Sequence, residues 1–278
     1  MEPLTVRLVS CAPRSGQENM AIDEYLHSWH MRTNRPFLRI YRWSPPSITM
    51  GRYQPVSCLD VDSCRARGVS IIRRITGGGA IYHDREVTYS LACGERDIDG
   101  RPLSVVESFE IMNKIIIRLY RMLGLPALFA KDIPACRTGV RRPDFCFSGN
   151  EGFDILIHGM KIGGNAQRRS GGSIFQHGTI PLVLDEERIR SCFKIPIDFR
   201  NFTTLDRIAG HMINEELVMA RLKDAFVIST GWRLKPSELD ADEMDHVREI
   251  MERRYLNERW NLEGRTEDDE EVPAAMAQ

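Results

Sequence analysis

The sequence predicts an α+β fold, in which a mixed and largely antiparallel sheet is flanked by helices. Short apolar segments bounded by glycine and proline are typical of strands, and several of them occur in the first two thirds of the chain. Segments whose apolar residues recur with a 3.6-residue period predict helices. Because the two kinds of segment do not alternate strictly, we favour α+β over a doubly wound α/β fold.

Most of the expected strands lie in the first third of the chain. The segment 5–11 predicts a strand, and the helix expected next, at 18–31, carries apolar side chains on one face: Ile22, Tyr25, Leu26 and Trp29. Further strands are expected, in order, at 37–43, 47–53, 69–75 and 80–93. The last of these is interpreted as one continuous strand, separated from the one before it by three glycines.

A second helix is expected at 103–124, because Ser104 and Glu107 have the spacing of a capping box and Gly124 is a suitable C-terminal stop. Strands are then expected at 154–164 and 173–183, the first folded into a hairpin at His158 and Gly159. Beyond about residue 203 the pattern becomes helical. We therefore predict a single domain over 1–262 that ends in helices, followed by a disordered acidic tail at 263–278.

Charge and cysteine content narrow the class of protein. The formal net charge is -1, so no general attraction to nucleic acid or to an anionic membrane is expected. No apolar run is long enough to span a bilayer and the N-terminus lacks the features of a signal peptide, so we expect a cytoplasmic protein. The seven cysteines are scattered without a C-x-x-C pair, which argues against a disulfide framework and a metal site.

Three glycine-bearing segments are the candidates for a binding site. In "RRITGGGAIYHD", at 73–84, three glycines allow close backbone approach to a ligand, and a Walker loop is excluded because no lysine followed by serine or threonine is present. "GMKIGGNAQRR", at 159–169, contains Lys161, and "SIFQHGTIPL", at 173–182, contains His177. Taken singly, these segments are equally consistent with a hairpin, a solvated lysine and a hydrogen-bonded structural histidine.

In order and spacing, these segments, together with "ENMAIDEYL" and "LRIYRWSPPSITMGRYQ", resemble the lipoate-protein ligase and octanoyl/lipoyl transferase family. This family belongs to the superfamily that includes biotin-protein ligases, and the resemblance covers most of residues 17–185. It implies a catalytic domain of the biotin/lipoate ligase type with a tunnel for a medium-length acyl chain near Lys161. The residues that it places around the acyl group or an adenylate are Arg74, Gly77, Gly78, Gly79, His83, Gly163, Gly164, Asn165 and His177.

The family contains two chemistries, and the resemblance leaves both open. A transferase takes an octanoyl or lipoyl group from another protein, commonly through an enzyme cysteine, and Cys146 lies fifteen residues before Lys161, where cysteine-dependent octanoyltransferases carry their nucleophile. The transferase reading is favoured by this cysteine, and also because we expect no accessory domain of the kind that full-length ligases have in the roughly 75 residues after the predicted sheet. The alternative is an ATP-dependent lipoate-protein ligase that forms a lipoyl-adenylate, with a separate accessory subunit. A binding module without activity is disfavoured by Lys161 and the three glycines.

The resemblance also implies cofactors and partners. The transferase reading needs no cofactor and no metal, with Cys146 and Lys161 as catalytic residues, whereas the ligase alternative needs ATP and Mg. The expected partners are an acyl-protein donor, an octanoyl or lipoyl group, and an acidic lipoyl domain or glycine-cleavage H-type protein as acceptor. We expect some of three basic pairs to line the docking face for this acceptor, in which case salt should slow association: 73–74, 141–142 and 168–169.

Overall fold

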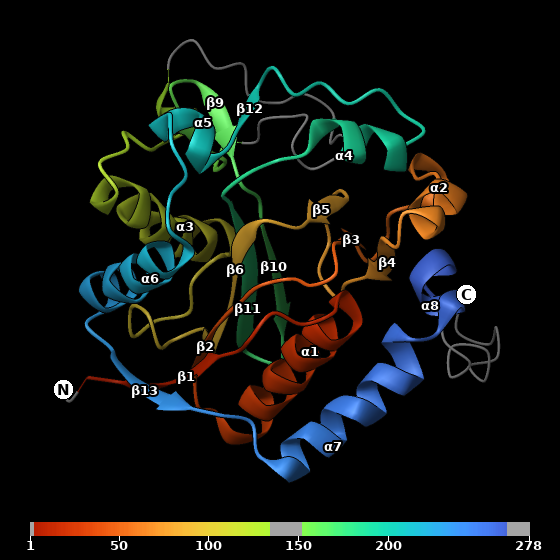
Figure 1. The fold of residues 1–278 in the computed structure, drawn as a ribbon. Helices are drawn as coiled ribbons and strands as arrows, with labels where there is room; N and C mark the ends of the chain where they lie inside the picture. Colours follow the sequence, from red (N-terminus) through yellow and green to blue (C-terminus); the bar gives the residue numbers. More distant parts are fainter. Residues whose placement is uncertain (1–2, 134–151, 266–278) are drawn as a thin grey trace, which may run out of the picture.

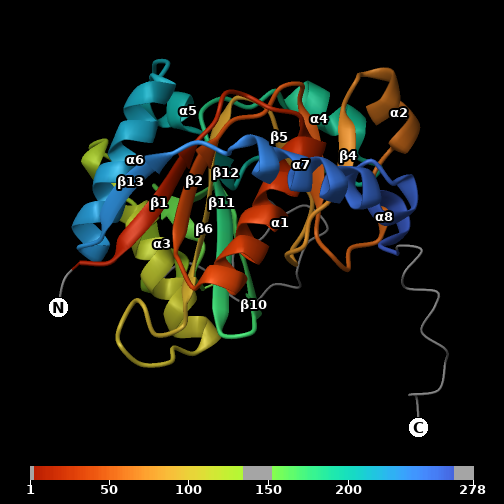
Figure 2. The same ribbon diagram turned by 90° about the horizontal axis from the view of Figure 1, so that it is seen from below.

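The computed structural model describes residues 3–133 and 152–265, and these residues form a six-stranded sheet, two smaller sheets and helices on both faces of the large sheet. Figure 1 shows α3 and α6 on one side of the large sheet and α1 and α7 on the other. The view from below in Figure 2 gives the same grouping. The site described below lies between the large sheet and the three-stranded sheet.

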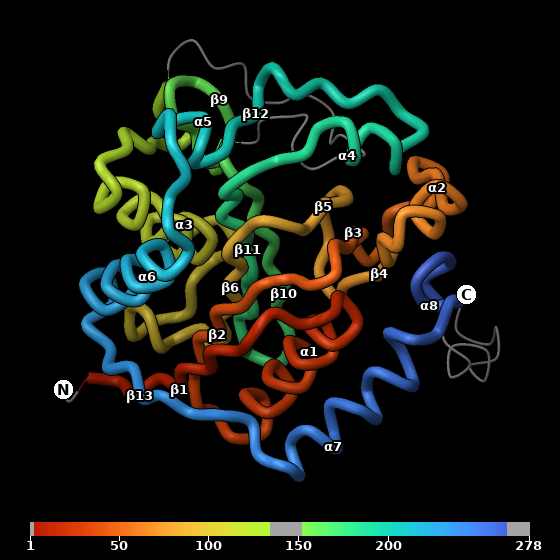
Figure 3. Tube along the Cα trace, viewed as in Figure 1, coloured from red at the N-terminus to blue at the C-terminus, as the bar shows by residue number. Residues whose placement is uncertain are grey.

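The six-stranded sheet has the order β10-β11-β6-β2-β1-β13. Neighbours from β10 to β2 are antiparallel, whereas β1 pairs in parallel with β2 and with β13, which comes from the other end of the chain (Figure 3). The predicted fold class is therefore confirmed. The strands are β1 (Thr5–Ser10), β2 (Phe37–Tyr41), β6 (Glu86–Gly94), β10 (Asn165–Ser170), β11 (Ser173–Pro181) and β13 (Arg233–Ser237).

Each face of this sheet packs on its own layer of helices. Val6, Leu38 and Leu91 lie in one apolar cluster with side chains of α3 (Val105–Met122) and α6 (Glu215–Thr230). Phe37 and Phe175 lie in a second cluster with α1 (Gly16–Thr33), against which α7 (Ala241–Ile250) packs from outside. Strands covered on both faces are buried along their whole length, which explains why β6 and β11 are apolar or uncharged at almost every position.

Two smaller sheets flank the large one. One has the order β4-β3-β5 and the other β12-β9-β8-β7. The expectation of one continuous strand at 80–93 is wrong, because the chain bends at Asp84 and Arg85, and β5 and β6 belong to different sheets. The strands are β3 (Ser47–Met50), β4 (Ser70–Arg73), β5 (Ile81–His83), β7 (Leu128–Phe129), β8 (Ile155–Ile157), β9 (Met160–Ile162) and β12 (Phe202–Thr203).

The helices begin at the residues that capping chemistry favours. Ser15 caps α1 by accepting from the backbone N–H of Glu18, and Ser104 and Glu107 form the predicted capping box of α3. Short helical elements connect the sheets: α2 (Val61–Ala66), α4 (Glu186–Cys192), α5 (Leu205–Ala209) and the 3-10 turns at Val56–Cys58 and Ala130–Asp132. None of the helices in the described parts of the chain is both long enough and apolar enough to cross a bilayer.

The C-terminal helical region is divided. After α7 the chain forms one π-helical segment (Met251–Tyr255), and α8 (Glu258–Glu263) then begins at Asn257, whose side chain caps its first turn. The chain is described to Arg265, and the carbonyl oxygen of Gly264 accepts a hydrogen bond from Arg52 at 2.7 Å. Residues 266–278 of the expected tail lie outside the described residues.

Candidate active site

A small cavity opens between the three-stranded sheet and the large sheet, and it gathers residues from most of the segments singled out in the sequence. Its free volume of about 20 Å³ is little more than one water molecule needs. An acyl chain can therefore enter only when lining side chains move. The lining residues are Met20, Tyr41, Trp43, Thr49, Arg74, Ile81, His83, Thr88, Gly164, Ala166, His177, Gly178 and Thr179.

Arg74 supports the glycine segment from beneath. Its side chain is 1% exposed, and it makes five hydrogen bonds to the described residues. The Nε atom donates to the Thr76 hydroxyl, Nη1 to the carbonyl and hydroxyl of Thr49, and Nη2 to the carbonyls of Gly77 and Gly79. All three nitrogen atoms of the guanidinium therefore donate within the protein. Arg74 thus holds the glycine turn in shape, and a direct contact with an acyl group stays a prediction.

The glycine turn, formed by Gly77, Gly78 and Gly79, requires glycine at one of its own positions and at Gly51, which lies against it. Gly78 has φ of 98°, in the region that side chains avoid. Gly51 lies directly against it, because a Cβ built at Gly51 would meet the Gly78 carbonyl oxygen at 1.9 Å. A Cβ at Gly77 would meet nothing within 4 Å. The chain therefore needs glycine at 51 and 78 for the fold, whereas at Gly77 the structure leaves space.

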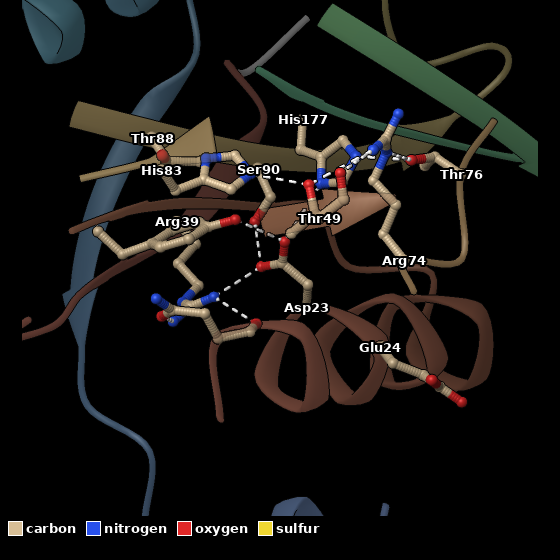
Figure 4. Close-up of polar contacts among 12 residues, drawn as sticks. Asp23, Glu24, Arg39, Thr49, Arg74, Thr76, His83, Thr88, Ser90 and His177 are labelled. Atoms are coloured by element: carbon tan, nitrogen blue, oxygen red, sulfur yellow. Dashed lines mark hydrogen bonds and ion pairs between the residues drawn. The ribbon is translucent and has the colours of Figure 1, made fainter. Parts of the chain in front are cut away.

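His177, on β11, joins a carboxylate to a hydroxyl (Figure 4). Its Nε2 atom lies 2.7 Å from the Thr76 hydroxyl, and its Nδ1 atom lies 3.5 Å from Oδ2 of Asp23 on α1. Burial lowers the pKa of His177, although Asp23 acts in the opposite direction. A neutral imidazole has one N–H, and we assign it to Nδ1, because the Asp23 carboxylate only accepts. Nε2 then accepts from Thr76.

His83, on β5, forms a second chain of the same kind. Its Nδ1 atom lies 2.7 Å from Oε1 of Glu86, and its Nε2 atom lies 2.7 Å from the Thr49 hydroxyl. The imidazole also stacks on Trp43, with ring centroids 3.9 Å apart. Both chains end at hydroxyls that accept from Arg74, so two carboxylate–imidazole–hydroxyl chains meet at one guanidinium.

Asp23 anchors the first chain in the protein interior. Its carboxylate accepts from Arg39 at 2.7 Å, from Ser90 at 2.8 Å and from Tyr41 at 2.8 Å. Burial alone would raise the pKa of this carboxyl group, but the charge of Arg39 and the contact with His177 lower it below its usual range. Asp23 is therefore ionised at neutral pH. The next residue, Glu24, points to the other side of α1 and accepts from Tyr255 at 2.6 Å.

Lys161 is a buried cation. The predicted hairpin is confirmed: β8 and β9 are antiparallel, and His158 and Gly159, with φ of 50° and 78°, have the positive φ that its turn requires. This hairpin brings the Lys161 ammonium within 2.7 Å of Oδ2 of Asp154, and the lysine side chain is 5% exposed. A carboxylate so close stabilises the ammonium form. Lys161 itself does not line the small cavity, which Gly164 reaches.

The residues after Lys161 connect it to β11. Gly163 has φ of 73°, and a Cβ there would meet the Thr179 carbonyl at 2.2 Å. The backbone of Gly164 accepts from the Thr179 N–H at 3.0 Å. The side chain of Asn165 accepts from the Tyr89 hydroxyl at 2.8 Å. The Lys161 segment is therefore packed tightly onto the strand that carries His177.

The expectations about Cys146 and about the three basic pairs have different outcomes. Cys146 and the basic pair 141–142 lie outside the described residues. Of the three basic pairs, the pair 73–74 cannot line a docking face, because Arg73 and Arg74 are 2% and 1% exposed and their guanidinium groups bind the chain's own carbonyls. Of the third pair, Arg168 is exposed.

Sequence reasoning missed the partners of the predicted residues. Asp23, Asp154 and Glu86 each hold a predicted residue in place, and Thr49 and Thr76 complete the hydrogen bonds. Asp23 lies within "ENMAIDEYL", a segment that carried the resemblance, but nothing in the sequence pairs it with a histidine 154 positions away. Asp154 carried a weak signal, since it is an acidic residue at the start of the hairpin that contains Lys161.

Comparison with known proteins gives the family. Residues 15–227 match the family described as the lipoyl protein ligase A/B catalytic domain. The octanoyltransferase LipM of Kyrpidia tusciae is 35% identical over 271 residues, which cover 92% of this chain and 98% of that protein. The octanoyltransferase LipM of Bacillus subtilis is 31% identical, over 94% of this chain and 99% of that protein.

The fold has a close counterpart among solved structures. A bipartite lipoate protein ligase of Thermoplasma acidophilum, from a structural analysis that includes its E2 lipoyl domain, has a TM-score of 0.75 and 22% identity, and the match covers 93% of this chain and 96% of that one. At this identity the likeness concerns the fold alone. With a family match over more than two thirds of its length and relatives aligned from end to end, this chain belongs to the lipoyl protein ligase A/B catalytic-domain family, as its motifs predicted.

Proposed function

We propose that this chain is an octanoyltransferase that moves an octanoyl or lipoyl group onto the target lysine of a lipoyl domain through an acyl thioester on Cys146. The observation that carries the proposal is the end-to-end correspondence with proteins named octanoyltransferase, which covers 98% of one such relative. The acceptor is a lipoyl domain or an H-type protein, and the donor is an acylated protein.

In the proposed mechanism the donor thioester is attacked first. A thiolate at Cys146 forms a bond to the carbonyl carbon, the bond from that carbon to the donor's sulfur breaks, and the donor's sulfur leaves as a thiolate. The amine of the acceptor lysine then attacks the new thioester, an amide forms, and the cysteine sulfur is released. The Lys161 ammonium, held by Asp154 at 2.7 Å, stabilises the negative charge that grows on the carbonyl oxygen in both steps.

The cavity is the proposed site of the acyl chain once its lining side chains move. It is lined by Met20, Trp43 and Ile81 as well as by the polar residues, and Gly164 joins its wall to the segment that carries Lys161. The transferase reaction needs no cofactor, because the thioester is already activated. ATP and Mg belong to the ligase alternative, in which the same cation would hold an adenylate oxygen.

One experiment separates the two chemistries. The purified chain is incubated with an apo lipoyl domain and octanoyl-carrier protein without ATP, and in parallel with lipoate, ATP and Mg. Intact-mass spectrometry then follows both proteins. We expect the acceptor to gain an octanoyl group without ATP, and we expect an octanoyl adduct on Cys146 when the acceptor is left out.

Variants make this test specific. Cys146→Ala should abolish both transfer and the adduct, whereas Cys11→Ala, which removes a half-buried thiol directly after β1, should retain both. Lys161→Ala should abolish transfer in either chemistry, because both use the cation. Full activity of Cys146→Ala together with a requirement for ATP would make the chain a ligase and leave Cys146 as a packing residue.

A further inference from the structure

An almost fully exposed aromatic side chain lies on the loop beside the glycine turn. Tyr53 is 88% exposed, the largest exposed fraction among the large apolar side chains of the described residues. Its loop touches the glycine turn directly, because a Cβ at Gly51 would meet the Gly78 carbonyl oxygen at 1.9 Å. A single exposed ring is common on protein surfaces, but the backbone beneath Tyr53 is held by an unusual number of contacts.

The loop that carries Tyr53 is a tight turn fixed from inside the protein. Arg52 and Tyr53 occupy its two central positions, and the N–H of Gln54 closes it by donating to the Gly51 carbonyl at 3.1 Å. The carbonyls of residues 51, 52 and 54 all accept from the buried guanidinium of Arg73, at 3.0, 3.2 and 2.7 Å. The backbone beneath the ring is therefore ordered before any partner arrives, which lowers the entropic cost of binding through it.

The side chain of Arg52 lies between two aromatic rings. Its guanidinium is 5.5 Å from the ring centroid of Tyr53 and 4.4 Å from that of Trp260 on α8, and it donates to the Gly264 carbonyl at 2.7 Å. These contacts limit the freedom of the arginine and of the tyrosine beside it. Tyrosine and arginine on a rigid support are the residues that most often dominate binding between proteins.

This turn and Arg168 contact neighbouring residues of the chain. The Arg52 N–H donates to the Thr76 carbonyl at 2.8 Å, and Arg168, an exposed residue of β10, donates to the Ile75 carbonyl at 3.2 Å. On the inner side, Arg74 donates to the carbonyls of the glycine turn and lines the cavity. The turn and Arg168 therefore lie immediately outside the cavity that is proposed for the acyl chain.

The charge of this part of the surface is positive. Arg52 and Arg168 supply two cations, and no acidic residue occurs in the turn or in residues 75–79. On α8, the carboxylate of Glu263 lies 3.6 Å from Arg259, which offsets its charge. A partner with an acidic face is attracted to such a local surface even though the chain as a whole has a formal net charge of -1.

We propose that Tyr53, Arg52 and Arg168 form a docking patch for the acceptor lipoyl domain and bind the acidic face around its target lysine. This inference rests on the proposed function. Tyr53 supplies apolar contact, and the two arginines supply the complementary charge. Because the patch binds the acceptor and takes no part in acyl chemistry, its loss raises the KM for the acceptor and leaves acylation of the enzyme unchanged.

The test measures transfer from octanoyl-carrier protein over a range of concentrations of an apo lipoyl domain. Tyr53→Ala and Arg168→Glu are each expected to lower kcat/KM for the lipoyl domain by about tenfold through a higher KM, with kcat within about twofold of wild type. Titration calorimetry with the same domain should show Kd raised by the same factor. Acylation by octanoyl-N-acetylcysteamine, a small thioester without a docking face, should proceed at the wild-type rate.

Matched variants on distant surfaces serve as controls. Arg233→Glu makes the same change in net charge at an exposed residue of β13, which forms the opposite edge of the six-stranded sheet from β10. Ile228→Ala removes an exposed apolar side chain from α6. Both should match wild type in KM and Kd. Salt should lower kcat/KM of wild type and Arg233→Glu in parallel, and that of Arg168→Glu less steeply.

Four outcomes would overturn the inference. If Tyr53→Ala leaves KM and Kd unchanged, the ring does not contact the acceptor. If Arg233→Glu weakens binding as much as Arg168→Glu, only net charge matters. If the patch variants slow acylation by octanoyl-carrier protein and not transfer to the lipoyl domain, the patch binds the donor. If they raise kcat/KM, the occupant is the chain's own acidic segment 267–271.

Failure of the proposed function gives a different result. A wild-type chain that transfers no octanoyl group at all contradicts the transferase and not the docking patch. The calorimetric Kd for the lipoyl domain needs no acyl transfer, so the comparison of Tyr53→Ala and Arg168→Glu with their controls still decides whether the patch binds this acceptor.

Discussion

Gly51 is a residue for which the structure predicts a large effect of a single methyl group. A Cβ there would meet the Gly78 carbonyl oxygen at 1.9 Å. The backbone on both sides of this contact is held in place, at Gly51 by Arg73 and on either side of Gly78 by Arg74. We expect Gly51→Ala to lower the free energy of unfolding by about 2–4 kcal/mol, measured by urea denaturation. Gly77→Ala is the control, because its Cβ meets nothing. Equal stability of the two variants would contradict the close approach.

At this scale the sequence predicts functional residues and not their partners. Lys161, His177 and the glycines belong to recognisable motifs, so their neighbourhood could be predicted, and the cavity does bring Arg74, His83, Gly164 and His177 together. The pairing of His177 with Asp23 and Thr76 is different. It depends on where α1 and the glycine turn lie relative to β11. Tertiary packing sets this arrangement, and no periodic pattern in the sequence predicts it.

Among the secondary-structure elements, α8 covers the end of an edge strand. It contacts Arg73, the last residue of β4: Asn261 accepts from the Arg73 N–H at 3.0 Å, and Trp260 donates to the Arg73 carbonyl at 2.9 Å. The Arg73 side chain in turn donates to the carbonyls of Trp260 and Gly51. A covered edge cannot pair with another chain, and α8 thereby also supports the loop against which the glycine turn lies.

We expect Asn261→Ala to lower the free energy of unfolding by about 1–3 kcal/mol, because the buried Arg73 N–H loses its acceptor. The control is Glu263→Ala, at the exposed end of the same helix, which should change stability by less than about 0.5 kcal/mol. Urea denaturation of both variants beside the wild type gives the comparison. If both variants unfold at the wild-type midpoint, α8 does not stabilise this edge.

Elements with a strong local pattern were predictable, and those defined by pairing were not. The helices α1, α3 and α6 and the hairpin β8–β9 follow from periodicity, caps and turn residues. The edge strand β13 pairs with β1 from more than two hundred residues away, and β10 is a polar edge strand, so neither has a clear alternation. The split between β5 and β6 was missed because a bend at two charged residues interrupts an otherwise continuous strand pattern.

For the molecule as a whole, buried histidines predict how stability depends on pH. His27 on α1 packs on Phe175, with ring centroids 5.1 Å apart, and burial, aided by the charges of Arg168 and His30, lowers its pKa to about 4. The folded state therefore resists a proton that the unfolded chain binds at its usual pKa of 6.5. Stability is complete above pH 6.5 and falls between that pH and about 4, by at most about 3 kcal/mol from this residue.

Replacing His27 should remove the part of this fall that His27 contributes. We expect His27→Leu to lose less unfolding free energy than wild type between pH 7.5 and 5, as measured by urea denaturation at both pH values. His211→Gln, at an exposed histidine, should behave as wild type. At still lower pH both proteins should weaken, because the lowered pKa of Asp23 means that its stabilising contacts are lost only as that carboxylate is protonated. Parallel curves for wild type and His27→Leu would rule out His27 as the source.

The placement of Asp23 and Glu24 on opposite sides of α1 links His177 on β11 to the C-terminal helical region. Asp23 faces the imidazole of His177, and Glu24 is bound by Arg254 and Tyr255 in the C-terminal region, which lies beyond the residues matched to the family. A rotation of α1 about its axis moves both carboxylates at once. Substitutions at Arg254 and at Thr76 are thus expected to be non-additive in a double-mutant cycle, even though these two residues belong to different layers of the fold.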